Sequence, residues 1–99
     1  MLQCMILSEK IPMNKIFTDN GWKDYVYWQA EDRMTLRKIN QLIEDIDRNG
    51  NGGIGKPEAL SGNLAGFWSR RINEKDRLIY MLKEDNVYIL ACRYHCETR

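Results

Sequence analysis

The sequence lacks the residues on which several small-protein classes depend. Its three cysteines, Cys4, Cys92 and Cys96, are an odd number without C-x-x-C spacing, which argues against a disulfide framework or a zinc site and favours a reducing compartment. No stretch approaches the ~18 apolar residues of a membrane span. The apolar start MLQCMILSEKIP has no basic residue before it and no small-residue cleavage site, which argues against a signal peptide. We therefore expect a cytoplasmic protein.

Charge of one sign is also missing. The 99 residues contain 15 basic and 14 acidic side chains, so the net charge of +1 does not indicate a nucleic-acid binder, although a local basic patch remains compatible with one. The length suits one domain. Residues 1–12 look like an appended extension that is not native, and Met13 is then the native start of a single domain over residues 13–99. An ordered N-terminal segment is the alternative.

Apolar periodicity predicts two helices after a short strand at residues 14–17. Thr18 or Asp19 can cap a first helix that runs to about residue 32. Asp32 can cap a second helix, whose apolar stripe we interpret as core packing. The stripe consists of Leu36, Ile39, Leu42, Ile43 and Ile46.

Beyond Pro57 the sequence is typical of strands. Residues 66–73, 77–83 and 86–95 are rich in β-branched and aromatic side chains, and short breaks suited to hairpin loops separate them. The predicted order is β-α-α-β-β-β. We expect an α+β fold in which two N-terminal helices pack on a mainly antiparallel, roughly four-stranded sheet.

The stretch DIDRNGNGGIGKPE (45–58) nearly matches two binding motifs. As a calcium loop that begins at Asp45, it has Lys56 at the position that needs a bidentate carboxylate. As a phosphate-binding loop, it has Pro57 where Ser or Thr should ligate Mg²⁺, and a helix precedes it where a strand should. We favour a plain connection from helix to sheet, with the glycines ending the helix.

The C-terminal half gathers groups suited to phosphate chemistry. They are Lys56, Glu58, Arg70, Arg71, Lys75, Arg77, Arg93 and the single histidine, His95. Strand alternation puts Arg71 on one face with Ser69 and Asn73, and Arg70 on the other with Trp68 and Ile72, so the two arginines cannot share a role. Singly, each is most simply a solvated surface charge. Together, Glu, His and Arg can supply the base, the acid and the charge stabilisation that RNA transesterification needs, without metal.

Several segments resemble a known family. YVYWQAEDR, KINQLIEDI, GKPEAL, NLAGFWSRRINEKDRLIY and ACRYH are similar to the YoeB (Txe/YoeB) family of bacterial toxins, within the RelE superfamily. The resemblance runs from Met13 to about His95. It implies a RelE-like α+β fold and a toxin of a type II toxin–antitoxin system, an endoribonuclease that cuts mRNA in the ribosomal A site and is neutralised by an antitoxin.

The resemblance also implies roles for individual residues. Glu58 of KPE matches the family's general base, Arg77 of DRLIY the arginine that stabilises the transition state, and His95 of RYH the general acid. Arg71 of SRRI matches a second arginine near the scissile phosphate, and Lys56 is expected to contact the RNA backbone. No cofactor or metal is implied.

The end of the chain departs from the family pattern. Family members typically carry an aromatic residue, usually Tyr, directly after the histidine, where this chain has Cys96. Cys96 and Tyr94 are the remaining expected substrate-binding positions. A thiol cannot stack on a base, and by simple strand alternation Tyr94 does not substitute for the missing aromatic residue. A second hypothesis is therefore a catalytically impaired toxin-fold protein that binds antitoxin or RNA without cleavage.

Three kinds of partner are expected: an acidic cognate antitoxin, the ribosome with its mRNA, and a second copy of the chain. Self-association would use the Trp-rich face of the first helix, Trp22 and Trp28. The competing interpretation places both tryptophans in the core.

Overall fold

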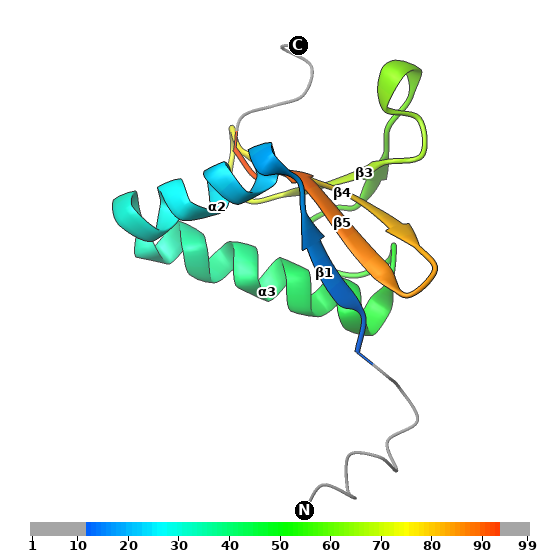
Figure 1. Ribbon diagram of the computed structural model, residues 1–99, viewed down its shortest axis with the longest axis horizontal. Helices are drawn as coiled ribbons and strands as arrows, with labels where there is room; N and C mark the ends of the chain where they lie inside the picture. The colour runs from blue at the N-terminus through cyan, green and yellow to red at the C-terminus, as the bar shows by residue number, and fades with distance from the viewer. Residues whose placement is uncertain (1–11, 94–99) are drawn as a thin grey trace, which may run out of the picture.

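Two helices cover one face of a five-stranded sheet (Figure 1). The computed structural model describes residues 12–93. The elements in chain order are β1 (Asn14–Phe17), α2 (Asp19–Glu31), α3 (Arg33–Asn49), β2 (Glu58–Ala59), the 3₁₀ turn η1 (Gly62–Leu64), β3 (Trp68–Arg71), β4 (Arg77–Lys83) and β5 (Asn86–Ala91). The predicted extension lies almost wholly outside the described residues, so its boundary at Met13 stays a prediction.

Both helices begin at the predicted caps. The Thr18 hydroxyl accepts a hydrogen bond from the Gly21 N–H at 3.0 Å. The Asp32 carboxylate accepts from the N–H groups of Met34 and Thr35 at 3.1 and 3.2 Å. Each side chain thereby satisfies backbone donors that a first helical turn leaves without partners. Gly50 ends α3 with a φ of +64°, as expected for the first glycine after the helix.

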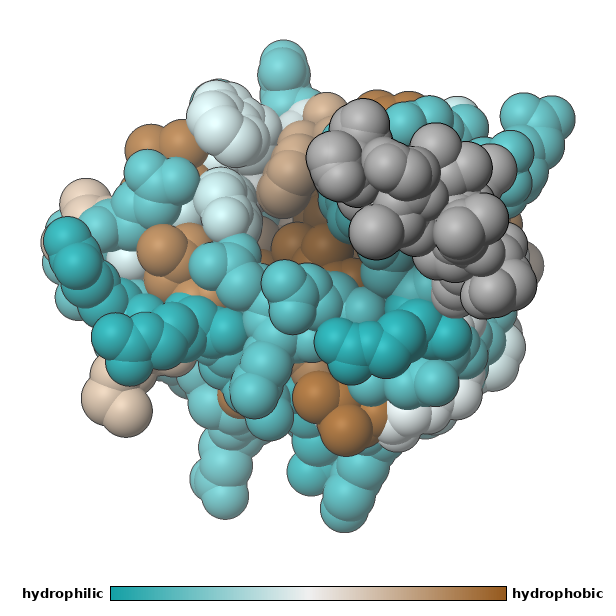
Figure 2. Space-filling model, turned by 90° about the horizontal axis from the view of Figure 1, so that it is seen from below, coloured by the Kyte–Doolittle hydropathy of each residue, from teal (hydrophilic) through white to brown (hydrophobic). Residues whose placement is uncertain are grey.

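The apolar stripe of α3 lies against the sheet and forms the core. Ile39, Leu42, Ile43 and Ile46 are all buried, and they belong to one cluster with the sheet residues Leu78, Tyr80, Val87 and Ile89. Trp28 of α2 completes that cluster. The side of the helical layer that faces away from the sheet is polar. Figure 2, seen from the α3 side, shows mostly hydrophilic side chains with small separate hydrophobic patches. This confirms that the stripe is a core-packing face.

The sheet contains one more strand than predicted. Its order is β1-β5-β4-β3-β2, with β1 parallel to β5 and the other pairs antiparallel. The additional strand, β2, has two residues, too few for an alternating pattern to be recognised in the sequence. Two predicted strands were too long: β3 occupies only residues 68–71 of 66–73, and β5 ends at Ala91, with residues 94 and 95 of its predicted range outside the described part.

The two tryptophans of the first helix have different environments. Trp28 is buried and donates from Nε1 to the Cys92 carbonyl at 2.8 Å. Trp22 is 51% exposed and contacts Phe17 edge-on and Tyr25 in a stacked arrangement. The core interpretation is therefore right for Trp28 and wrong for Trp22.

Helix α2 approaches β5 closely at Gly21, a buried glycine. A β-carbon built at Gly21 overlaps the carbonyl oxygen of Ile89. Because that neighbour is backbone of a central strand, it cannot move aside cheaply.

We expect Gly21→Ala to lower the free energy of unfolding by about 1–3 kcal/mol, the range for overpacking a well-packed contact. Denaturant unfolding measures the change. Gly52→Ala is the matched control, because a β-carbon at Gly52 has its nearest neighbour at 3.7 Å and the expected effect there is within about 0.5 kcal/mol. Equal stability of the two variants would contradict the close-packing argument.

Candidate active site

A buried arginine positions the loop that leads into β2. Arg70 has no exposed surface, and all of its nitrogens act as donors. Nη1 donates to the Asp45 carboxylate at 2.6 Å and to the Ile54 carbonyl at 3.0 Å. Nη2 donates to the carbonyls of Gly50 and Gly52, both at 2.7 Å, and Nε donates to the Tyr80 hydroxyl at 3.2 Å. The guanidinium therefore ties the end of α3, the glycine loop and β4 together.

The loop needs glycine where it passes the Arg70–Asp45 pair. Gly53 has a φ of +115°, and a β-carbon there would overlap the Asp45 carboxylate. The Asp45 carboxylate also accepts from the Ile54 N–H and from the Asn49 side chain, whereas Asp47 accepts from Lys15 and from the Met13 N–H. Two residues of the calcium-like pattern thus have separate structural partners.

Strand register brings three of the predicted site residues to one face. Glu58 lies opposite Ser69, and Arg71 lies opposite Arg77. Side chains directly opposite each other on antiparallel strands share a face, with β-carbons about 4.5–5.5 Å apart. Ser69 and Arg71 are two residues apart and also share that face. Glu58, Arg71 and Arg77 therefore form a cluster on the face away from Leu78 and Tyr80, and we call this cluster the Glu58 face.

The Glu58 face is accessible at its edge and buried at its centre. Glu58 and Arg71 are exposed, whereas Ser69 and Ile79 between the strands are 6% and 2% exposed. Like charges directly opposite each other destabilise a sheet. Without an anion, the Arg71–Arg77 pair therefore destabilises the sheet. The two guanidinium groups are well placed to bind an anion.

A tight turn holds Arg77. The Asn73 side-chain oxygen accepts from the N–H groups of Lys75 and Asp76 at 2.9 and 2.7 Å, which closes the β3–β4 connection. Arg77 then donates from Nη1 to the carbonyls of Asn73, Glu74 and Asp76. Among residues 12–93, the hydrogen bonds of the Arg77 side chain all use Nη1, so Nη2 and Nε can donate to an anion.

The end of β5 is anchored to α2 just before the predicted general acid. The Cys92 N–H donates to the Asp24 carboxylate at 3.0 Å, and the Arg93 guanidinium lies 3.5 Å from the centre of the Tyr27 ring. Burial, reinforced by the charges of Asp24 and Asp76, raises the pKa of the Cys92 thiol to about 12, so the thiolate needed for nucleophilic chemistry is disfavoured.

The remaining predicted site residues are placed only in part. Lys56 is exposed and has a φ of +52°, directly before the strand that carries Glu58. Tyr94, His95 and Cys96 lie outside the described residues, so the geometry of the general acid stays a prediction. Sequence reasoning did not identify the role of Arg70. Two features of the sequence could have indicated that role: Arg70 lies on the same strand face as Trp68 and Ile72, and Asp45 lies beside the apolar stripe of α3.

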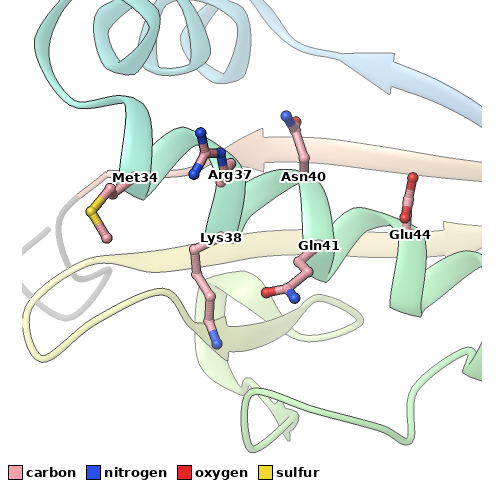
Figure 3. Close-up of a pocket in the computed structure, with 6 residues that line it drawn as sticks. All are labelled: Met34, Arg37, Lys38, Asn40, Gln41 and Glu44. Atoms are coloured by element: carbon pink, nitrogen blue, oxygen red, sulfur yellow. The ribbon is translucent and has the colours of Figure 1, made fainter.

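A shallow hollow on the outer side of α3 is separate from the Glu58 face. Figure 3 shows its lining residues along one helix: Met34, Arg37, Lys38, Asn40, Gln41 and Glu44. Its volume is about 380 Å³, and none of the three residues of the Glu58 face lines it. Within the described chain, no group of three His, Cys, Asp or Glu side chains is placed to hold a metal ion, and neither helix is long and apolar enough to cross a membrane.

The fold and the cluster have counterparts among bacterial toxins. Residues 17–96 match the family described as "YoeB-like toxin of bacterial type II toxin-antitoxin system". Toxin YoeB of Escherichia coli (strain K12) is 51% identical over 83 residues, which is 84% of this chain and 99% of the relative.

Two solved structures from Staphylococcus aureus are similar throughout. A YoeB dimer has a TM-score of 0.81 at 44% identity, and a heterotetrameric YoeB–YefM toxin–antitoxin complex has a TM-score of 0.80 at 44% identity. Each comparison covers 86% of this chain and 99% of the other. The protein is a toxin of a type II toxin–antitoxin system with a RelE-like fold. Within that class, the chain belongs to the YoeB-like toxin family.

The Arg70–Asp45 pair predicts a pH dependence of stability. The hydrogen bond from Arg70 is the main cause that lowers the pKa of the Asp45 carboxyl from its usual value. Because the folded-state pKa lies below the unfolded value of about 3.9, the stabilisation is fully present above about pH 5 and is lost as the pH falls through the folded-state pKa. Asp45→Asn should therefore be less stable than the wild type at pH 7, and the difference should narrow in acid.

Urea unfolding between pH 7 and pH 3 measures this difference. Asp85→Asn, in the exposed β4–β5 turn, is the control and should keep the wild-type profile. A stability gap between the wild type and Asp45→Asn that is constant with pH would contradict the assignment.

Proposed function

We propose that this toxin is a ribosome-dependent endoribonuclease that cuts mRNA in the A site by 2′-OH transesterification without metal. The observation that carries the proposal is the register that puts Glu58, Arg71 and Arg77 on one face. A carboxylate next to two guanidinium groups combines a proton acceptor with charge stabilisation for a phosphate that gains negative charge. Family membership supports the same chemistry.

The proposed reaction assigns each group one step. The Glu58 carboxylate takes the proton of the 2′-OH, and the 2′-oxygen attacks the adjacent phosphorus. Arg77 and Arg71 stabilise the charge on the non-bridging oxygens. His95 donates a proton to the departing 5′-oxygen, which leaves a 2′,3′-cyclic phosphate and a 5′-OH end.

The ribosome compensates for the toxin's small net charge. A charge of +1 gives weak general attraction to RNA. In the confined A site the mRNA is presented at high effective concentration and already positioned, which reduces the binding free energy that the toxin must supply. The protein would then act in the cytoplasm, where translating ribosomes are found.

Two protein partners follow from the relatives. The Staphylococcus aureus relative assembles with YefM, and we propose an acidic antitoxin that covers Arg71 and Arg77 of this chain. A relative also forms a dimer, and we propose that the exposed apolar residues Ile16, Trp22 and Val26 supply the corresponding contact here.

Removing the base tests the reaction. Glu58→Gln should lower the rate of mRNA cleavage about 10²–10⁴-fold, the usual contribution of a general base. Primer extension on mRNA from translating ribosomes locates the cuts, and the 2′,3′-cyclic phosphate identifies the product. Glu31→Gln, at the exposed end of α2, is the matched control and should cleave at the wild-type rate. Wild-type cleavage by Glu58→Gln would refute the role of Glu58.

The second hypothesis, a toxin fold that binds without cleaving, depends on Cys96. Cys96→Tyr should raise ribosomal cleavage about tenfold, because stacking of a base on an aromatic side chain contributes about 1–3 kcal/mol and a thiol provides none. Cys96→Ser, which also lacks a ring, is the control. Intact transcripts with the wild type and cleavage only with Cys96→Tyr would favour the binding-only hypothesis. Equal cleavage by the wild type and by Cys96→Tyr would contradict the stacking argument.

A further inference from the structure

A second hollow lies where α3, the glycine loop and the β3–β4 turn meet. Its volume is about 310 Å³, and it is lined by Lys38, Gly55, Lys56, Arg71, Ile72, Asn73 and Glu74. We call this hollow the basic pocket, because three of its side chains are cationic and one is acidic. The basic pocket shares Arg71 with the Glu58 face, so the two sites are contiguous.

Lys38 reaches the basic pocket from the helical layer. Its side chain is half-buried, and Figure 3 shows it extending from α3 toward the strands, on the opposite side of the helix from Arg37 and Asn40. The same side chain lines the basic pocket together with Arg71 and Asn73. A long lysine stem can pack against a helix while the ammonium group remains available to an anion.

The backbone places the other two cations, Lys56 and Arg71, close to each other. The Arg71 N–H donates to the Gly55 carbonyl at 2.7 Å, which extends the β2–β3 pairing to the residue before Lys56. Lys56 itself has a left-handed φ of +52°, a conformation that is uncommon for a residue other than glycine. Such local strain persists where the surrounding structure holds it and often accompanies a functional site.

We infer that the basic pocket binds the RNA phosphate next to the one that is cut, with Lys38 and Lys56 as its ligands and Arg71 between the two phosphates. This inference rests on the proposed function. An RNA strand fits better than an acidic peptide because Arg71 belongs to both sites. A strand with one phosphate at Arg71 and Arg77 presents its neighbouring phosphate, at a covalently fixed spacing, to the adjoining pocket. Glu74, which also lines the pocket, is its one acidic side chain.

Binding of a non-cleavable RNA tests the pocket independently of catalysis. The probe is a fluorescent single-stranded RNA with 2′-O-methyl riboses, measured by anisotropy with the full chain at low salt. Lys38→Gln should raise Kd about three- to fivefold and reduce the slope of log affinity against log salt by about 0.7, as for the loss of one phosphate contact. Lys38→Arg should retain the wild-type affinity.

Lys23→Gln, an exposed lysine on α2, is the matched control and should leave Kd unchanged. Thermal unfolding of Lys38→Gln checks that the variant is folded. On translating ribosomes, Lys38→Gln should raise the toxin concentration for half-maximal cleavage and leave the single-turnover rate at saturation within about twofold of the wild type.

The outcomes separate this inference from the proposed function. If the wild type cleaves mRNA and Lys38→Gln binds the RNA probe with unchanged affinity, the inference about the basic pocket is wrong and the proposed function is unaffected. A wild type that does not cleave, with RNA affinity still reduced in Lys38→Gln, would overturn the function and support the pocket. If Lys38→Gln weakens binding of a labelled glutamate decamer but not of the RNA probe, the pocket binds acidic protein and the inference is wrong.

Discussion

The buried guanidinium of Arg70 is the interaction on which the rest of the structure depends. A charge without exposed surface is costly unless its donors are all satisfied, and here one carboxylate, three loop carbonyls and one tyrosine hydroxyl accept them. These acceptors come from α3, the glycine loop and β4. Because one side chain joins the helical layer to the sheet, the loop that ends at Glu58 has a defined course although it contains four glycines among residues 50–55.

The defined course of the loop is what gives the Glu58 face its geometry. Glu58 lies on a strand of two residues, which by itself contributes little pairing energy. Its position depends instead on the Gly55–Arg71 hydrogen bond before it and on the Ser69 pairing beside it. Strand alternation gives Arg70 and Arg71 different environments: Arg70 holds the loop from the core side, and Arg71 is exposed on the opposite face. Arg71 also lines the basic pocket together with Lys38 and Lys56.

Several local features were predictable because their causes are local. Thr18, Asp32 and Gly50 mark helix ends through their own side chains or backbone freedom, and the α3 stripe follows from helical period. The paired arginines were correctly assigned to opposite faces. The fifth strand and the role of Arg70 were missed, because the first is too short to show a period and the second depends on acceptors as many as 25 residues away in the chain. For Trp22 the expected core position was wrong, since helix α2 turns only part of its aromatic face inward.

By itself the sequence determined the helices, the main strands and the residue types of the candidate site. Periodicity, capping and motif resemblance each depend only on residues that are close together in the chain. Only the tertiary structure decided which of those residues meet. Strand register places Arg71 opposite Arg77 and Glu58 opposite Ser69, and the packing of α3 on the sheet brings Lys38 to the hollow that Arg71 also lines. These are long-range contacts, and the side chains that create them carry no local signal of their partners.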